Sequence, residues 1–297
     1  MNLRLHADPG AFGGLPEPSD YQTSRFAVLP IAYDGTSTWQ KGADAGPAAV
    51  LVASANMELY DIETDSEPWR SGIVTMAPHQ GYPSPEAMVA DVRATTDQLL
   101  RDGKTVVGLG GEHSVTIGLV QAHAARFPGL NVLQLDAHAD TRPQYEGSAN
   151  NHACVMARVA EVCPYVQVGI RSMDAAEKAS LDPRRTLFGH QVGEPAAVLK
   201  WLLPRLPGPV YVTIDLDVLD PSEMPSTGTP EPGGMRYRQL VEILDGVCRH
   251  RQVVGFDVVE LMPRPENRAP DFLACRLVYQ LMAYLIAFDK EKSVAKE

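Results

Sequence analysis

The chain has 297 residues, of which 44% are hydrophobic and 21% are charged, and its formal net charge is −11. This composition is typical of a globular protein that can bury a substantial core. The acidic balance argues against nucleic-acid binding, which requires a basic surface, and is compatible with a small cationic substrate.

The four cysteines, Cys154, Cys163, Cys248 and Cys275, are scattered and include no C-x-x-C pair. In a chain of this length they indicate free thiols in a reducing compartment. The first residues lack the apolar region of a signal peptide, and no apolar run approaches the roughly 20 residues that cross a bilayer. We therefore expect a cytoplasmic protein that does not associate with membranes.

Short apolar runs of β type alternate with helical patterns along most of the chain. Residues 1–24, rich in Gly and Pro, are expected to form an irregular N-terminal arm. The expected strands are 26–31, 72–76, 105–109, 130–136, 165–170, 185–188, 210–215 and 252–259, and the clearest expected helices are 84–103, 115–127, 237–250 and 270–288. This alternation predicts one α/β domain over residues 25–297. Its central parallel sheet has about eight strands, with helices covering both faces.

Two of the expected helices carry further information. The first opens at Ser84-Pro85, a favourable N-cap followed by proline in the first turn, and it stops at Gly103. The last, over residues 270–288, is apolar around much of its circumference. This pattern predicts burial in the core or at a subunit interface.

Ionisable side chains follow two of the expected strands with a period of two. Asp136, His138 and Asp140 follow the strand at 130–136, and Asp215 and Asp217 end the strand at 210–215. This spacing places each group on one face of its strand, because successive side chains alternate sides. Open α/β sheets bind ligands beyond the carboxyl ends of their strands. We therefore expect the two groups to contribute to one site.

A glycine-rich turn, Gly110-Gly111-Glu112-His113-Ser114, joins another expected strand to a helix. It contains neither G-x-G-x-x-G nor the P-loop pattern, so phosphate binding is not indicated. The glycines instead give the backbone room to project His113 into the same crevice.

The expected ligand set contains two imidazoles and four carboxylates: His113, His138, Asp136, Asp140, Asp215 and Asp217. Four negative charges balance two divalent cations, and ligands of this type suit Mn²⁺, and less distinctively Co²⁺ or Fe²⁺, better than structural zinc. Two such ions at about 3.5–4 Å acidify a shared water, so this set predicts a hydrolase.

The combined motifs resemble the ureohydrolases, the arginase/agmatinase superfamily. The three principal matches are residues 110–114 (GGEHS), 136–140 (DAHAD) and 215–221 (DLDVLDP). The similarity extends to residues 33–36 (YDGT), 46–49 (GPAA), 227–234 (TGTPEPGG) and 255–260 (GFDVVE). It therefore covers about 230 residues in the order that the family shows.

The resemblance implies a role for each ligand. One manganese ion would bind His113, Asp136, Asp140 and Asp215, and the other would bind His138, Asp136, Asp215 and Asp217. Asp136 and Asp215 would bridge the two ions, and Asp140 would also orient the hydroxide that attacks the substrate.

Two further residues have counterparts in the family. Glu260 matches the guanidinium-binding glutamate, and a planar cation favours a bidentate carboxylate. His152 matches a histidine on a mobile loop that passes a proton to the leaving amine, although a lone histidine at a helix start is often only a surface residue. Asp220, in an Asp-Pro turn, is interpreted as structural. Asp257 is interpreted as a supporting or structural residue, and Glu112 as an acid favoured at a helix N-terminus.

The loop between Asp140 and His152 decides the substrate. Where arginases carry an asparagine for the amino-acid head, this chain has Arg142, so recognition of L-arginine is doubtful. Residues 145–147 and 152–156 resemble the agmatinases, for which the products would be putrescine and urea. If the Arg142 side chain points into the pocket, it would favour a substrate with a carboxylate, such as 4-guanidinobutyrate or 3-guanidinopropionate. If it pairs with Glu146 or another loop acid, agmatine remains the expected substrate. We favour the pairing.

Two readings of the chain remain open beside the agmatinase hypothesis. A formimidoylglutamase is disfavoured because that branch lacks the histidine matched by His152. A non-catalytic member that binds metal or a polyamine is disfavoured by the intact ligand set and Glu260. Family habit also implies a homo-oligomer, either a trimer or a hexamer.

Overall fold

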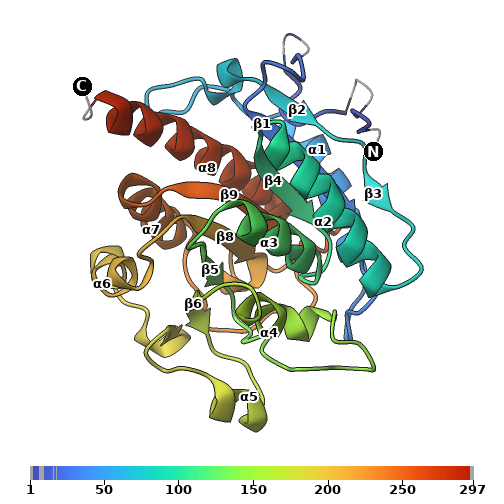
Figure 1. The fold of residues 1–297 in the computed structure, drawn as a ribbon, viewed down its shortest axis with the longest axis vertical. Coiled ribbons are helices and arrows are strands. Elements are labelled where there is room, and N and C mark those ends of the chain that lie inside the picture. Colours follow the sequence, from blue (N-terminus) through green and yellow to red (C-terminus); the bar gives the residue numbers. More distant parts are fainter. Residues whose placement is uncertain (1–2, 7–9, 16, 18, 295–297) are drawn as a thin grey trace.

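The computed structural model describes residues 3–6, 10–15, 17 and 19–294, which build a parallel sheet between helices (Figure 1). Its strands are β1 (Phe26–Ala32), β2 (Ile73–Thr75), β3 (His79–Gln80), β4 (Thr105–Gly110), β5 (Asn131–Leu135), β6 (Tyr165–Ile170), β7 (Thr186–Phe188), β8 (Val210–Asp215) and β9 (Val253–Val259). The order across the sheet is β2-β1-β4-β9-β8-β5-β6-β7, with β3 beside β1, and every pairing is parallel. The predicted α/β fold class is confirmed.

Helices cover both faces of this sheet, as the sequence predicts. The α-helices are α1 (Gly46–Ser54), α2 (Pro85–Arg101), α3 (Val115–Arg126), α4 (Val155–Ala160), α5 (Ala175–Ser180), α6 (Pro195–Leu202), α7 (Tyr237–His250) and α8 (Ala269–Val294). One core cluster joins the sheet to α1, α6, α7 and α8, and another joins it to α2, α3 and α4.

The alternation of side chains along a strand explains these two cores. In β1, Phe26 and Val28 pack into the first core, whereas Ala27 and Leu29 pack into the second. All four side chains are fully buried. A central parallel strand buried on both sides is expected to be a continuous apolar run rather than an alternating one.

The predicted elements agree with the structure to within a few residues at most ends. The strands at 165–170 and 210–215 and the helix at 237–250 have the predicted bounds. Ser84 is the N-cap of α2, and its hydroxyl accepts a hydrogen bond from the Ala87 amide at 3.2 Å. The prediction missed β3, a pair of residues too short to give a periodic signal, and it ended α8 too early.

Part of the N-terminal arm, residues 1–2, 7–9, 16 and 18, lies outside the described residues. Elsewhere in the arm, Leu5 forms an isolated antiparallel bridge with Met76. Phe12 is fully buried in the first core, and its amide donates to the Thr75 hydroxyl at 2.9 Å. The described part of the arm is therefore held against the edge of the sheet beside β2.

The expectation that no apolar run approaches membrane-spanning length needs correction for α8. By length and composition alone, its segment Ala269–Asp289 is apolar enough to cross a bilayer. However, 78% of the most apolar window is buried inside the fold, where it packs against α1 and α7 (Figure 1). A core helix of a globular protein has the same composition, because it is apolar all round.

The strand order brings the predicted site residues together. The motifs that contain them follow β4, β9, β8 and β5, which are four consecutive neighbours in the sheet. Because all strands are parallel, their carboxyl ends lie at one edge, although the strands are far apart in sequence.

Candidate metal centre and substrate pocket

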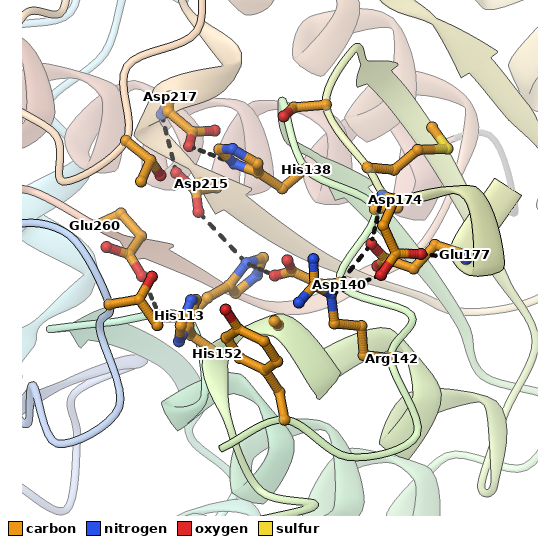
Figure 2. A pocket seen from close by; sticks show the side chains of 17 residues that line it. His113, His138, Asp140, Arg142, His152, Asp174, Glu177, Asp215, Asp217 and Glu260 are labelled. Carbon is orange, nitrogen blue, oxygen red and sulfur yellow. Dashed lines mark hydrogen bonds and ion pairs between the residues drawn. The ribbon is translucent and has the colours of Figure 1, made fainter.

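Six side chains at this edge form the ligand cluster: His113, Asp136, His138, Asp140, Asp215 and Asp217. Figure 2 shows all of them except Asp136. Five of them line a cavity of about 280 Å³, and the sixth, Asp136, is fully buried beneath it. Two groups of ligand atoms lie within 4.8 Å of one another: His113 with Asp136 and Asp140, and Asp136 with His138 and Asp217. Asp136 belongs to both groups.

His113 forms the centre of the first group. Its Nδ1 lies 3.1 Å from an Asp136 oxygen, 3.0 Å from an Asp140 oxygen and 3.4 Å from an Asp215 oxygen. The side chain is fully buried, yet Nδ1 has no hydrogen bond of normal geometry to any described residue. A buried nitrogen aimed at three carboxylates is a costly arrangement unless a cation lies among them.

The second group is arranged around His138, which is half-buried. Its Nδ1 lies 2.8 Å from Asp217 and 3.8 Å from Asp136. Backbone amides hold these carboxylates in place: Ala137 donates to Asp217 at 3.0 Å, and Asp217 donates to Asp215 at 2.9 Å. Asp215 faces His113 but lies outside both close groups, so it is the loosest of the six ligands.

The crowding of carboxylates perturbs their ionisation. Burial, with the charges of Asp140 and Asp217 adding to it, raises the pKa of Asp136 to about 7. Burial alone would lower the pKa of His138, but Asp217 raises that pKa to about 10, and His138 in turn lowers the pKa of Asp217 to about 2. Burial also raises the pKa of Asp215 well above its ordinary value, and the neighbouring carboxylates add to this. Divalent cations would remove this repulsion, so the residues fit a binuclear metal site.

Two residues of the site have a left-handed backbone that is uncommon outside glycine. The φ angles are 53° at Asp140 and 66° at Glu260. Strain of this kind costs about 1–3 kcal/mol and concentrates at functional sites, where the surrounding structure enforces it. It turns the Asp140 and Glu260 side chains toward the cavity that both residues line.

Glu260 lies directly after β9, beside the cluster (Figure 2). Its Oε1 accepts the His113 amide at 2.7 Å, and its own amide donates to the Gly111 carbonyl at 2.7 Å. Burial raises the pKa of this carboxyl well above its ordinary value, with the Glu112 charge adding to the rise. The predicted guanidinium ligand is thus a half-buried carboxylate at the cavity wall that favours a cationic partner.

His152 also lines the cavity (Figure 2). It begins a short 3-10 turn, His152–Cys154, whose N-cap Asn151 accepts the Ala153 amide at 3.0 Å. The Tyr145 ring approaches the imidazole edge-to-face, at 6.2 Å between centroids. The histidine therefore borders the pocket and is not a free surface residue.

The residues interpreted as structural have the expected surroundings. Asp220 accepts hydrogen bonds from Ser222, Gly233 and Gly234, which lower its pKa to about 2. Asp257 is fully buried and accepts from the hydroxyls of Tyr211, Thr213 and Thr116. The Thr213 hydroxyl in turn lies 2.9 Å from His113 Nε2. Asp257 therefore orients the His113 ring through Thr213.

Four further lining residues form a group that we call the rim: Arg142, Tyr145, Asp174 and Glu177. Figure 2 labels the three charged ones. The Arg142 guanidinium lies 3.4 Å from both carboxylates and stacks on the Tyr145 ring at 4.3 Å. The predicted pairing of Arg142 with a nearby acid is therefore found, but the partners come from α5 and its N-cap rather than from Glu146.

Sequence reasoning missed the rim acids and the surroundings of Glu112. Asp174 and Glu177 form a capping box at the start of α5, a signature visible in the sequence. That signature does not reveal their position beside Arg142. Glu112 does not cap α3; it contacts Thr36 and Ser114 instead.

Comparison with known proteins agrees with this geometry. Residues 24–284 match the family model described as "Arginase family". An N(1)-aminopropylagmatine ureohydrolase of Thermus thermophilus is 40% identical over 271 residues, covering 87% of this chain and 89% of that protein. An agmatinase of Pyrococcus horikoshii is 28% identical over 276 residues, covering 89% and 93% respectively.

A solved structure provides a third comparison. The agmatine ureohydrolase of Thermoplasma volcanium superimposes with a TM-score of 0.85 at 27% identity, covering 96% of this chain and 97% of that one. The family match spans most of the chain, and the cluster lies where the family motifs predict. The chain belongs to the arginase family, and within that family it is similar to amidinohydrolases that act on linear guanidino compounds.

Proposed function

We propose that this protein hydrolyses the guanidinium group of a linear cationic guanidine of the agmatine type, releasing urea and an amine. The observation that carries the proposal is one pocket in which two His/Asp groups sharing Asp136 lie beside the half-buried carboxylate of Glu260. The first part suits a pair of divalent cations, and the second suits a planar cation.

We propose Mn²⁺ as the metal, because the donors are mainly carboxylate oxygens with two imidazoles and no thiolate. One ion would be held by His113, Asp136, Asp140 and Asp215, and the other by His138, Asp136, Asp215 and Asp217. When bound, such a pair supplies a water acidic enough to attack at neutral pH. Asp140, which lines the cavity, orients that water.

Glu260 and His152 act on the substrate in this proposal. The His113 amide fixes one Glu260 oxygen, and the carboxylate orients the guanidinium so that its carbon faces the cluster. His152 gives a proton to the departing amine, which would otherwise leave as a strongly basic anion. Urea and the free amine are the products.

The charge of the pocket supports a polycationic substrate. Its lining carries six carboxylates against one guanidinium, and Asp136 adds a seventh carboxylate below. Two divalent cations would leave the pocket acidic. Arg142 is already paired with Asp174 and Glu177, so it offers little attraction to a substrate carboxylate.

We therefore propose N(1)-aminopropylagmatine, with one more amine than agmatine, as the first substrate to test, and agmatine as the second. The name of the Thermus thermophilus relative, 40% identical, supports the longer substrate, whereas agmatinases such as that of Pyrococcus horikoshii are 28% identical.

We also propose a cytoplasmic homo-oligomer, a trimer or hexamer. The four cysteines are buried free thiols, which suits a reducing compartment. Tyr60, Ile62 and Phe272 line one surface hollow and are 49%, 84% and 40% exposed, which suits a subunit contact. Light scattering after gel filtration measures the oligomeric state.

Urea release from the manganese-loaded protein tests the proposed function. The substrates to compare are N(1)-aminopropylagmatine, agmatine, L-arginine, 4-guanidinobutyrate and 3-guanidinopropionate. We expect the two cationic amines to exceed the three guanidino acids in kcat/KM. A preference for a guanidino acid would contradict the assignment of Arg142, and inactivity on all five with both metals bound would favour a binding protein.

A further inference from the structure

The backbone amide and the ring of His152 both contact the hydroxyl of Thr36, which lies just beyond β1. The His152 amide donates to the Thr36 hydroxyl at 2.9 Å, and His152 Nδ1 lies 3.2 Å from the same hydroxyl oxygen. The two residues are 116 positions apart in the chain. Thr36 therefore fixes the position of His152 and also which edge of its ring faces the pocket.

Thr36 is itself held by Glu112. The Thr36 amide donates to Glu112 Oε2 at 2.6 Å, and the Thr36 hydroxyl donates to Oε1 at 2.7 Å. The Ser114 hydroxyl also donates to Oε1. Glu112 is fully buried, so these contacts supply the hydrogen bonds that water would otherwise provide.

The directions of these hydrogen bonds can be assigned from the donors available. A threonine hydroxyl has one proton, and the short contact with the Glu112 carboxylate takes it. Because the hydroxyl then only accepts, the proton in its contact with His152 must be on Nδ1. Neutral His152 would carry its proton on Nδ1, leaving Nε2, at the other side of a ring that lines the pocket, as the nitrogen for the substrate.

We propose that Thr36 and Glu112 are positioning residues that hold His152 as the Nδ1-protonated tautomer and present Nε2 to the leaving amine. The inference deepens the proposed function and rests on it for the role of His152. In the reaction, Nε2 first takes up a proton released by the attacking water and then passes it to the amine nitrogen as the carbon–nitrogen bond breaks, while Nδ1 keeps its own proton throughout. The Glu112 charge, transmitted through Thr36, stabilises the imidazolium before transfer.

Substitution of Thr36 tests the hydrogen-bond chain. Thr36→Val keeps the shape but removes the hydroxyl; we expect kcat for the best substrate to fall about 10- to 100-fold, within the range of lost acid–base catalysis, with KM and metal content unchanged. Thr36→Ser should restore kcat to within about threefold, because the hydroxyl is retained. Thr96→Val, at a buried hydroxyl of α2 with no partner among the described residues, is the matched control and should behave as wild type.

The tautomer can be observed without any turnover. Long-range ¹H–¹⁵N spectra of ¹⁵N-histidine protein loaded with diamagnetic Zn²⁺ distinguish the tautomers, and His152→Asn identifies the His152 signals. We expect the Nδ1–H pattern in wild type. Glu112→Gln should give the Nε2–H pattern instead. The amide oxygen of Gln accepts from the Thr36 amide, and its NH₂ donates to the Thr36 hydroxyl. That hydroxyl then donates its own proton to His152 Nδ1. Metal content must be checked in this variant, since Glu112 precedes His113.

These outcomes separate the inference from the proposed function. If wild-type protein releases no urea but shows the Nδ1–H pattern, the proposed function fails and the positioning geometry stands. An Nε2–H pattern in wild type would overturn the inference even in an active enzyme. A Thr36→Val variant that keeps full kcat would also overturn the inference. The same holds if this variant loses metal, or if its KM rises as much as its kcat falls, because Thr36 would then only support the loop.

Discussion

The ligand cluster and the rim share one pocket, but they are built differently. The cluster comes from the ends of three strands, β4, β8 and β5, and five of its six side chains are buried, with backbone amides fixing its carboxylates. The rim comes from the loop after β5 and from α5, and two of its charged groups are partly exposed: the Asp174 side chain is 43% exposed and that of Arg142 28%, whereas Glu177 is buried.

This difference separates chemistry from specificity. A change in the cluster leaves buried charges without partners, which costs several kcal/mol in related cases. A change at Asp174 alters an ion pair that water screens, and such pairs are worth about 0–1 kcal/mol. The rim can therefore vary among relatives that cleave different guanidines, while the cluster must keep its geometry.

The largest effect is expected for Asp136, the only residue in both ligand groups. Asp136→Asn should remove both metals and reduce urea release to background, because a neutral amide bridges two cations poorly. Metal content by mass spectrometry and urea release measure this. Asp182→Asn, an exposed carboxylate paired with Arg184, is the control. Retained activity with two metals bound would contradict the bridging assignment.

A smaller effect is expected for Glu260. In Glu260→Gln the amide oxygen still accepts from the His113 amide, so the backbone keeps its anchor. The charged contact with the guanidinium is lost, and we expect KM to rise about 10- to 100-fold, from the 1.5–3 kcal/mol of such bonds, with metal content unchanged. Simultaneous loss of metal would mean that Glu260 belongs to the cluster.

The cluster also predicts a dependence of stability on pH. Metal-free, Asp136 has its pKa raised from 3.8 to about 7 and His138 from 6.5 to about 10. Both contributions favour folding at low pH and are lost as pH rises through the folded values, so Tm should fall between pH 5 and 8. With saturating Mn²⁺ the trend should reverse, because protons compete with the metal.

Thermal unfolding at several pH values, with chelator and with Mn²⁺, measures these two opposite trends of Tm. At a metal concentration 100 times the Kd, stabilisation of about 2.7 kcal/mol raises Tm by about 4 °C in a chain of this length. If Tm depends on pH in the same way with and without Mn²⁺, the cations do not bind at the cluster.

The smallest effect is expected at the rim. Asp174→Asn keeps the N-cap of α5 but removes a charge beside Arg142. We expect KM for N(1)-aminopropylagmatine to rise about two- to fivefold, with a smaller change for agmatine, in line with a partly screened ion pair. Steady-state kinetics with both substrates measure the ratio of the two changes in KM. An equal change for both would place the extra amine away from Asp174.

The sequence by itself determined the sheet, most element bounds and all six cluster residues. Their signals are local: an apolar run defines each strand, and the cluster residues stand at its end. The period of two predicted Asp136, His138 and Asp140 on one face of the strand, but β5 ends at Leu135, so all three lie in the loop that follows it. The parallel α/β pattern then puts every strand end at the same edge, so short motifs far apart in the chain were enough to predict one site.

Only the tertiary structure decided the contacts that act across the chain. Arg142 is paired with Asp174 and Glu177 rather than with Glu146. Thr36 connects Glu112 to His152, although it precedes the histidine by 116 positions. A single charged or hydroxyl side chain has no periodicity, and its partner depends on which loops the fold brings together. The proposed metal ligands could therefore be predicted from the sequence, whereas the surroundings of Arg142 and His152 depend on tertiary packing.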